Sequence, residues 1–179
     1  MRRKVENSED DEKESSCIAG FRAAYVFDVT QTDGQELPQI GVVRGDPCEY
    51  SDGLRKFAAA QNIAIEYSED IAPARGTSDG GRIALLPGQS PAEEFSTLVH
   101  ELAHELLHRG DRREQTSRTI RETEAEATAF AVCHAIGLET GSAASDYIQL
   151  WNGDKETLTN SLTHIQKAAS QMLAALTDS

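Results

Sequence analysis

The sequence has little cysteine and no long apolar run, and each shortage argues against a class of protein. Its three cysteines, Cys17, Cys48 and Cys133, are odd in number and widely spaced. This pattern argues against a disulfide framework and is typical of a reducing, cytoplasmic compartment. No apolar stretch approaches the ~20 residues of a membrane-spanning helix, so we expect no membrane association. Polar and acidic residues follow Met1 to Lys4, so we expect no signal peptide.

Basic residues are also scarce relative to acidic ones. The chain has 17 Lys plus Arg against 30 Asp plus Glu, which gives a formal net charge of −13. Such an acidic balance argues against broad, non-specific binding to nucleic acid or to anionic membranes. The length of 179 residues and the hydrophobic content of 39% suit one domain with one core.

The composition divides the chain into a tail and a domain. Residues 1–17 are highly charged and have almost no large apolar side chain, so we expect a disordered tail there and one domain over 18–179. Short strands are predicted over residues 21–30, 62–68 and 82–86. Helices are predicted over residues 46–60, 90–109, 119–136, 145–151 and 154–176. Short strands early and helices later predict an α+β fold.

Two of these helices begin with a cap residue, a proline and a glutamate in the first turn, at Asp46–Glu49 and at Ser90–Glu93. The intervening segments 75–81 and 111–118 are predicted to be a Gly-rich turn and a polar loop. One face of the last helix is apolar, and it contains Leu158, Leu162, Ile165, Ala169, Met172 and Leu176. We interpret this face as core, with a dimer seam as the alternative.

The motif H-E-x-x-H occupies residues His100 to His104, inside the helix predicted over 90–109. Residues i and i+4 lie one above the other on a helix, so both imidazoles can reach one ion. Glu101 can then reach a metal-bound water and take its proton. His108 lies one further turn along, too far for a third ligand on a straight helix. We interpret it as a solvated residue at the helix end or cleft wall.

A zinc site needs a third protein ligand, and the helix over 119–136 offers three glutamates. A helical wheel places Glu122 close to the apolar face, Glu126 at its margin and Glu124 pointing away from it. Glu122 is therefore the predicted third ligand. Glu126 is predicted to support a ligand histidine or, alternatively, to be the ligand itself. Thr119 offers another alternative, because Thr119-x-x-Glu122 is a capping box that would assign Glu122 to the helix start.

Three segments in this order resemble a known family. They are FSTLVHELAHELLH, RETEAEATAFAVCHAIGL and SDYIQLW. Together they resemble the zincin-type metallopeptidase domain of ArdC-like antirestriction proteins and, more distantly, the ImmA/IrrE metallopeptidases. The resemblance implies a zincin-like domain, with a small mixed sheet packed on an active-site helix and with C-terminal helices. Its E-x-x-A pattern followed by an acid or amide falls on Glu122, Ala125 and Glu126, which implies Glu122 as the ligand.

ArdC-like proteins carry an N-terminal domain that binds single-stranded DNA. Residues 18–40 resemble only the end of such a domain, and the rest of it is missing from this sequence. An acidic chain without a basic, aromatic-studded groove is also poorly suited to single-stranded DNA. We therefore expect a protein or peptide partner rather than DNA.

The residues and the resemblance together predict a cytoplasmic zinc metallopeptidase with one Zn²⁺ per chain, linked to antirestriction, mobile elements or DNA-related regulation. His100, His104 and Glu122 would hold the ion, and Glu101 would activate a zinc-bound water. Tyr147 is a tentative cleft residue, for which a place in the core or rim is the alternative. The alternative function is a non-catalytic, metal-stapled acidic module that binds a DNA-handling protein.

The strand predicted over 82–86 directly precedes the helix of the motif. Zincins usually bind their substrate as an added strand at the edge of the sheet beside the active helix. We therefore predict the strand over 82–86 to be that edge.

Overall fold

The computed structural model describes residues 43–140 and 155–177, which belong to the unit Gln39–Ser179. The predicted tail, the strand over 21–30 and the helix over 145–151, which includes Tyr147, lie outside the described residues. The helices are α1 (Tyr50–Ala60), α2 (Pro91–Leu107), α3 (Asp111–Gln115), α4 (Arg118–Ala135) and α6 (Lys155–Thr177). The strands are β1 (Ala64–Tyr67), β2 (Gly76–Ser78) and β3 (Arg82–Leu85). The predicted α+β fold is confirmed.

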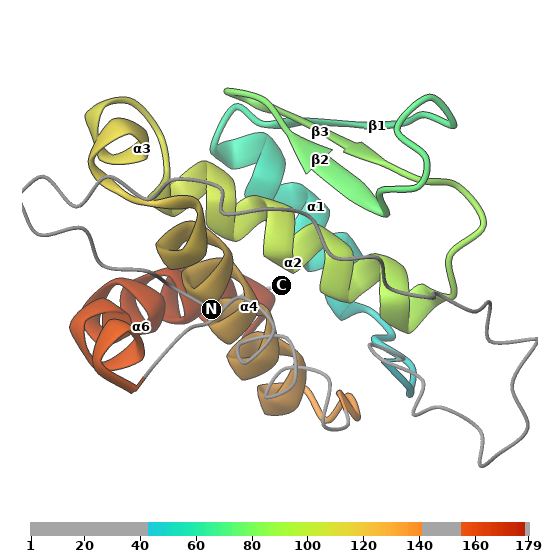
Figure 1. Ribbon diagram of the computed structural model, residues 1–179. Helices are drawn as coiled ribbons and strands as arrows, with labels where there is room; N and C mark the ends of the chain where they lie inside the picture. Colours follow the sequence, from blue (N-terminus) through green and yellow to red (C-terminus); the bar gives the residue numbers. More distant parts are fainter. Residues whose placement is uncertain (1–42, 141–154, 178–179) are drawn as a thin grey trace, which may run out of the picture. The chain divides into compact units, whose positions relative to one another are not determined.

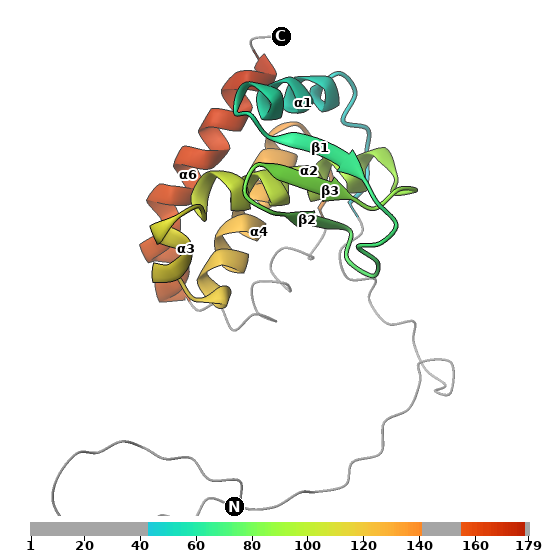
Figure 2. The same ribbon diagram turned by 90° about the horizontal axis from the view of Figure 1, so that it is seen from above.

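The sheet lies on one side of α2, and α4 and α6 lie on the other (Figure 1). Its strand order is β1-β3-β2, with β1 parallel and β2 antiparallel to β3. Figure 2 shows α1 beside β1 and α6. A single cluster of buried apolar side chains joins these elements, with Leu54, Ile83, Leu102 and Met172 fully buried within it. Among the described helices, none is both long enough and apolar enough to cross a membrane.

The prediction that residues 82–86 form an edge strand is wrong, because β3 is the central strand. The segment 75–81, predicted to be a turn, contains the strand β2 in its first half, and only residues 79–81 turn the chain. A strand of three residues that itself begins with a glycine is too short for a strand pattern to show in a sequence. The buried Glu105 on α2 fixes this turn, because its carboxylate accepts a hydrogen bond of 2.7 Å from the Gly81 amide.

One predicted helix start and one predicted loop also change. The first helix begins at Tyr50, because the Asp46 carboxylate accepts from the Cys48 amide at 2.9 Å and forms a turn instead of a cap. Cys48 has a φ of 48°, which no helix accommodates. The predicted polar loop over 111–118 contains the short helix α3.

The apolar face predicted for the last helix is largely confirmed as core. Ile165, Ala169, Met172 and Leu176 are buried, but Leu162 is 46% exposed. Ser161 and Ala168 are buried in addition. The wheel favoured the large Leu162, whereas the small side chains of Ser161 and Ala168 take buried positions on this helix, which packs against α4.

Candidate metal centre

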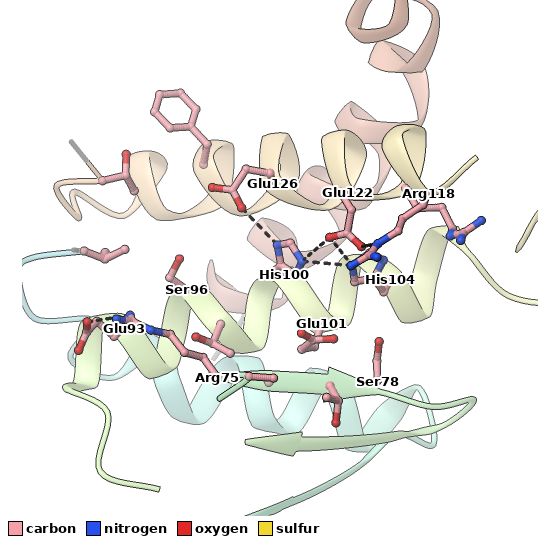
Figure 3. Close-up of a pocket in the computed structure, with 18 of the residues that line it drawn as sticks. Arg75, Ser78, Glu93, Ser96, His100, Glu101, His104, Arg118, Glu122 and Glu126 are labelled. Carbon is pink, nitrogen blue, oxygen red and sulfur yellow. Dashed lines mark hydrogen bonds and ion pairs between the residues drawn. The ribbon is translucent and has the colours of Figure 1, made fainter. Parts of the chain in front are cut away.

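The helix α2 positions the motif because its two faces differ. Its start is fixed by a complete capping box. The Ser90 hydroxyl accepts a hydrogen bond from the Glu93 amide, and the Glu93 carboxylate accepts one from the Ser90 amide. Phe95, Leu98, Val99 and Leu102 are buried in the core. The side chains of His100 and His104 point the other way, toward α4, and are 19% and 12% exposed (Figure 3).

Three potential ligand atoms converge between α2 and α4. The Nε2 atoms of His100 and His104 lie 3.1 Å apart. The Oε2 atom of Glu122 lies 3.6 Å from the first and 3.7 Å from the second. Neighbouring ligands of a tetrahedral ion with bonds of 2.0–2.1 Å are about 3.3 Å apart. The donor set of two imidazoles and one carboxylate therefore fits a divalent cation such as zinc, and these three residues form a group that could hold an ion.

The capping alternative for Glu122 is wrong. The N-cap of α4 is Ser117, whose hydroxyl accepts from the Ile120 amide at 3.2 Å. Thr119 lies inside the helix, so Thr119-x-x-Glu122 is not a capping box. The carboxylate of Glu122 is instead turned toward the two histidines. Burial raises its pKa, but the attraction of these imidazoles outweighs burial and holds the pKa well below its usual range.

Glu126 lies one turn further along α4 and contacts the other side of His100. Its Oε2 atom is 3.3 Å from His100 Nδ1, so it can orient this ring and leave Nε2 directed at Glu122 and His104. Burial lowers the pKa of His100, but hydrogen bonds to Glu122 and Glu126 outweigh it and raise the pKa to about 10. Binding of a cation between the two histidines would compete with this proton and release it.

An open cleft of about 840 Å³ adjoins this cluster. Glu101, Glu122 and Glu126 line it together with the edge strand β2 (Figure 3). Four arginines also line it, namely Arg75, Arg113, Arg118 and Arg121. The guanidinium of Arg121 is bonded to the carbonyls of Arg113 and Thr116, which fixes the α3–α4 connection.

Glu101 lies in this cleft but outside the group of three ligands. It is buried, and the backbone of Gly76 on β2 passes directly over it. A Cβ atom at position 76 would lie 2.9 Å from Glu101 Cγ and 2.6 Å from Thr97 Cγ2. Only glycine allows the edge strand to approach the carboxylate so closely.

The structure reveals a second cluster that the sequence analysis missed. His108 is not solvated as predicted: its side chain is fully buried, with Nδ1 3.0 Å from His104 Nδ1 and Nε2 2.8 Å from Glu124 Oε2. Glu124 was predicted to point away from the core but is also buried. Arg112 binds both of its carboxylate oxygens, at 2.8 and 2.7 Å.

One sequence signal could have found this cluster, and one assumption hid it. Residues His104 to His108 repeat the H-E-x-x-H spacing, although Glu105 of this second copy is bound to Arg109 and the Gly81 amide. The wheel for α4 assumed a single buried face, whereas the helix packs against α2 on one side and α6 on the other. Glu124 lies on a face that the single-face assumption leaves in solvent.

Comparison with known proteins supports part of the resemblance. Residues 63–146 match the model of a peptidase family described as "IrrE N-terminal-like domain". The chain is 26% identical, over 86% of its length, to the uncharacterized protein pXO2-81 of Bacillus anthracis, and it spans 30% of that protein's length. No solved structure matches the chain. Neither match supports the resemblance to ArdC-like antirestriction proteins. The family match supports an ImmA/IrrE-like metallopeptidase over residues 63–146, and within them lie the three residues that could hold its metal.

Proposed function

We propose that this chain is a zinc-dependent peptidase of the zincin type. The observation that carries the proposal is the convergence of His100 Nε2, His104 Nε2 and Glu122 Oε2 at one point beside a cleft that also contains Glu101. A purely structural metal site has no use for a carboxylate at position 101. The acidic group beside the ligands therefore favours catalysis over a metal staple.

His100, His104 and Glu122 would hold the ion, in the number of protein ligands that a catalytic zinc site uses. A bound zinc ion lowers the pKa of water toward ~7 and polarises a carbonyl group. Glu101 accepts the proton of the attacking water and passes it to the leaving amine as the peptide bond breaks. Burial beneath β2 limits the positions that the Glu101 side chain can adopt.

The edge strand β2 is the place where an extended peptide can bind. β3 occupies one of its edges, and the other edge has no strand partner among the residues that the structure describes. Gly76, Thr77 and Ser78 line the cleft beside α2. A peptide paired with them would pass Glu101 and the ligand group.

The setting that we propose is cytoplasmic, with a protein substrate linked to antirestriction or to regulation around DNA. The link to antirestriction or DNA rests on the resemblance to ArdC-like proteins, and the compartment rests on the few, widely spaced cysteines.

The first experiment measures metal content per chain, by elemental analysis, on wild type, His104→Ala and Glu101→Gln. We expect about one zinc in wild type and in Glu101→Gln, and none in His104→Ala. Cleavage of a fluorogenic peptide library should fall by roughly 10²–10⁴-fold in Glu101→Gln, the scale of general-base catalysis.

The same metal and cleavage measurements distinguish the alternatives to this proposal. Wild type that carries no metal after zinc is added back would overturn the metal centre. Metal in wild type with equal cleavage by wild type and Glu101→Gln would overturn the catalytic role of Glu101. Metal without cleavage in any form of the protein would favour the binding module.

A further inference from the structure

A chain of hydrogen bonds leads away from the ligand His104 to residues that do not line the cleft. His104 Nδ1 and His108 Nδ1 are 3.0 Å apart, and His108 Nε2 and Glu124 Oε2 are 2.8 Å apart. Arg112 binds both oxygens of Glu124 and also donates to the Leu107 carbonyl at 2.8 Å. His108 is absent from the cleft lining, so it does not contact a substrate there.

With Glu124 ionised and His108 neutral, the donors and acceptors of this chain can be arranged in only one way. A carboxylate accepts hydrogen bonds only, so His108 Nε2 carries a proton and donates it. In a neutral imidazole the other nitrogen then has no proton, so His108 Nδ1 is an acceptor. His104 must therefore donate from Nδ1, which leaves its Nε2 lone pair directed at His100 and Glu122.

Charge balance keeps His108 neutral in this arrangement. Glu124 carries one negative charge and Arg112 one positive charge, so the buried pair is already neutral. A second positive charge on the fully buried His108 ring would be unpaired, which is costly away from water. It would also place two N–H groups against each other at the His104 contact, or force His104 to carry its proton on Nε2.

We propose that His108, held by Glu124 and Arg112, is a positioning residue that fixes the tautomer of His104 and so keeps Nε2 available for the metal. The inference rests on the proposed metal centre and deepens it. His100 receives the equivalent support directly from Glu126, whose side chain is 21% exposed. His104 receives it through a second imidazole, from a carboxylate that is 1% exposed. Water can therefore compete with Glu126 for the hydrogen bond to His100, but it cannot reach the carboxylate of Glu124 that supports His104.

Two substitutions at position 108 separate the two hydrogen bonds of this ring. In His108→Asn the amide oxygen occupies the place of Nδ1 and still accepts from His104. In His108→Gln the amide nitrogen occupies the place of Nε2 and still donates to Glu124, but the acceptor facing His104 is lost. Both variants leave a similar void in the core, so a loss of packing affects them alike.

The test measures the zinc dissociation constant of full-length wild type and both variants by competition with a chelator. Loss of support behind a ligand histidine typically weakens metal binding about 10–100-fold. We expect a loss of this size in His108→Gln, and binding within a few-fold of wild type in His108→Asn. Thermal unfolding of the metal-free proteins shows whether both variants fold. Equal affinities in the two folded variants would overturn the proposal.

A spectroscopic measurement tests the tautomer without relying on activity or on bound zinc. Two-bond ¹H–¹⁵N correlation spectra of the chelator-treated protein show which nitrogen of His104 is protonated. We expect the proton on Nδ1 in wild type and His108→Asn, and a mixture of tautomers in His108→Gln. A proton on Nε2 in wild type would overturn the proposal. Wild type that has the expected tautomer but binds no zinc would overturn the proposed function alone.

Discussion

At the scale of single residues, the site depends on Gly76, which has no side chain, as much as on its ligands. Gly76 has ordinary backbone angles, so turn geometry does not require glycine there. What requires it is the closeness of Thr97 and Glu101 on α2, at 2.6 and 2.9 Å from the place of a Cβ atom. The same closeness places the edge strand directly over the proposed general base.

Gly76→Ala is therefore expected to destabilise the protein and to displace Glu101. Overpacking of this kind costs about 1–3 kcal/mol, which urea unfolding can measure. Cleavage should fall while zinc is still bound, because no ligand contacts position 76. Adding Thr97→Ser removes the nearest methyl group and keeps the hydroxyl that bonds Gln89, so it should restore part of the stability. Unchanged stability in the single variant would contradict the contact.

At the scale of elements, the start of α4 decides what Glu122 does. The helix begins one turn before Glu122, at the Ser117 cap, so Glu122 lies within the helix and faces α2. Had Thr119 been the cap, Glu122 would have closed the helix end and could not have reached the histidines. Two residues of register therefore separate a ligand from a capping residue.

The matched variants Ser117→Ala and Thr119→Ala test this register. Loss of an N-cap costs about 1 kcal/mol, so Ser117→Ala should lower the free energy of unfolding by that amount. Thr119→Ala should have almost no effect, because alanine is favoured inside a helix. A cost confined to Thr119→Ala in urea unfolding would instead support the capping box and remove Glu122 from the site.

At the scale of the whole molecule, Glu124 connects the elements that surround the site. Its side chain contacts His108 at the end of α2, Arg112 of α3 and Ser161 of α6. Thr128, one turn along α4, is bonded to its carbonyl. Burial raises the pKa of Glu124, but its bonds to His108 and Arg112 outweigh burial and lower the pKa to about 2.

This carboxylate is expected to make stability depend on acid pH. Its folded pKa lies below the unfolded value of 4.5, so its stabilisation is complete above pH 4.5 and is lost as the pH falls toward 2. We expect the free energy difference between metal-free wild type and Glu124→Gln to be largest at neutral pH and to narrow between pH 4.5 and 2. Urea unfolding over this range measures it, and a constant difference would contradict the pairing.

The sequence by itself determined the elements that local rules govern. The capping box at Ser90 fixed α2, and the i, i+4 spacing brought His100 and His104 to one side of it, because helical periodicity needs no tertiary contact. The position of Glu122 close to the apolar face of its helix was also visible in the sequence. The metal roles of these residues stay predictions until the metal is measured.

Only the tertiary structure decided which elements are neighbours. The pairing of β2 with β3 moved the sheet edge to Gly76–Ser78, because strand order depends on contacts that a local pattern does not encode. The burial of α4 between α2 and α6 turned Glu124 from an apparent surface residue into the partner of His108 and Arg112. A helix with two buried faces has no single polar side, so its buried charges become recognisable only once the neighbouring helices that pair them are in place.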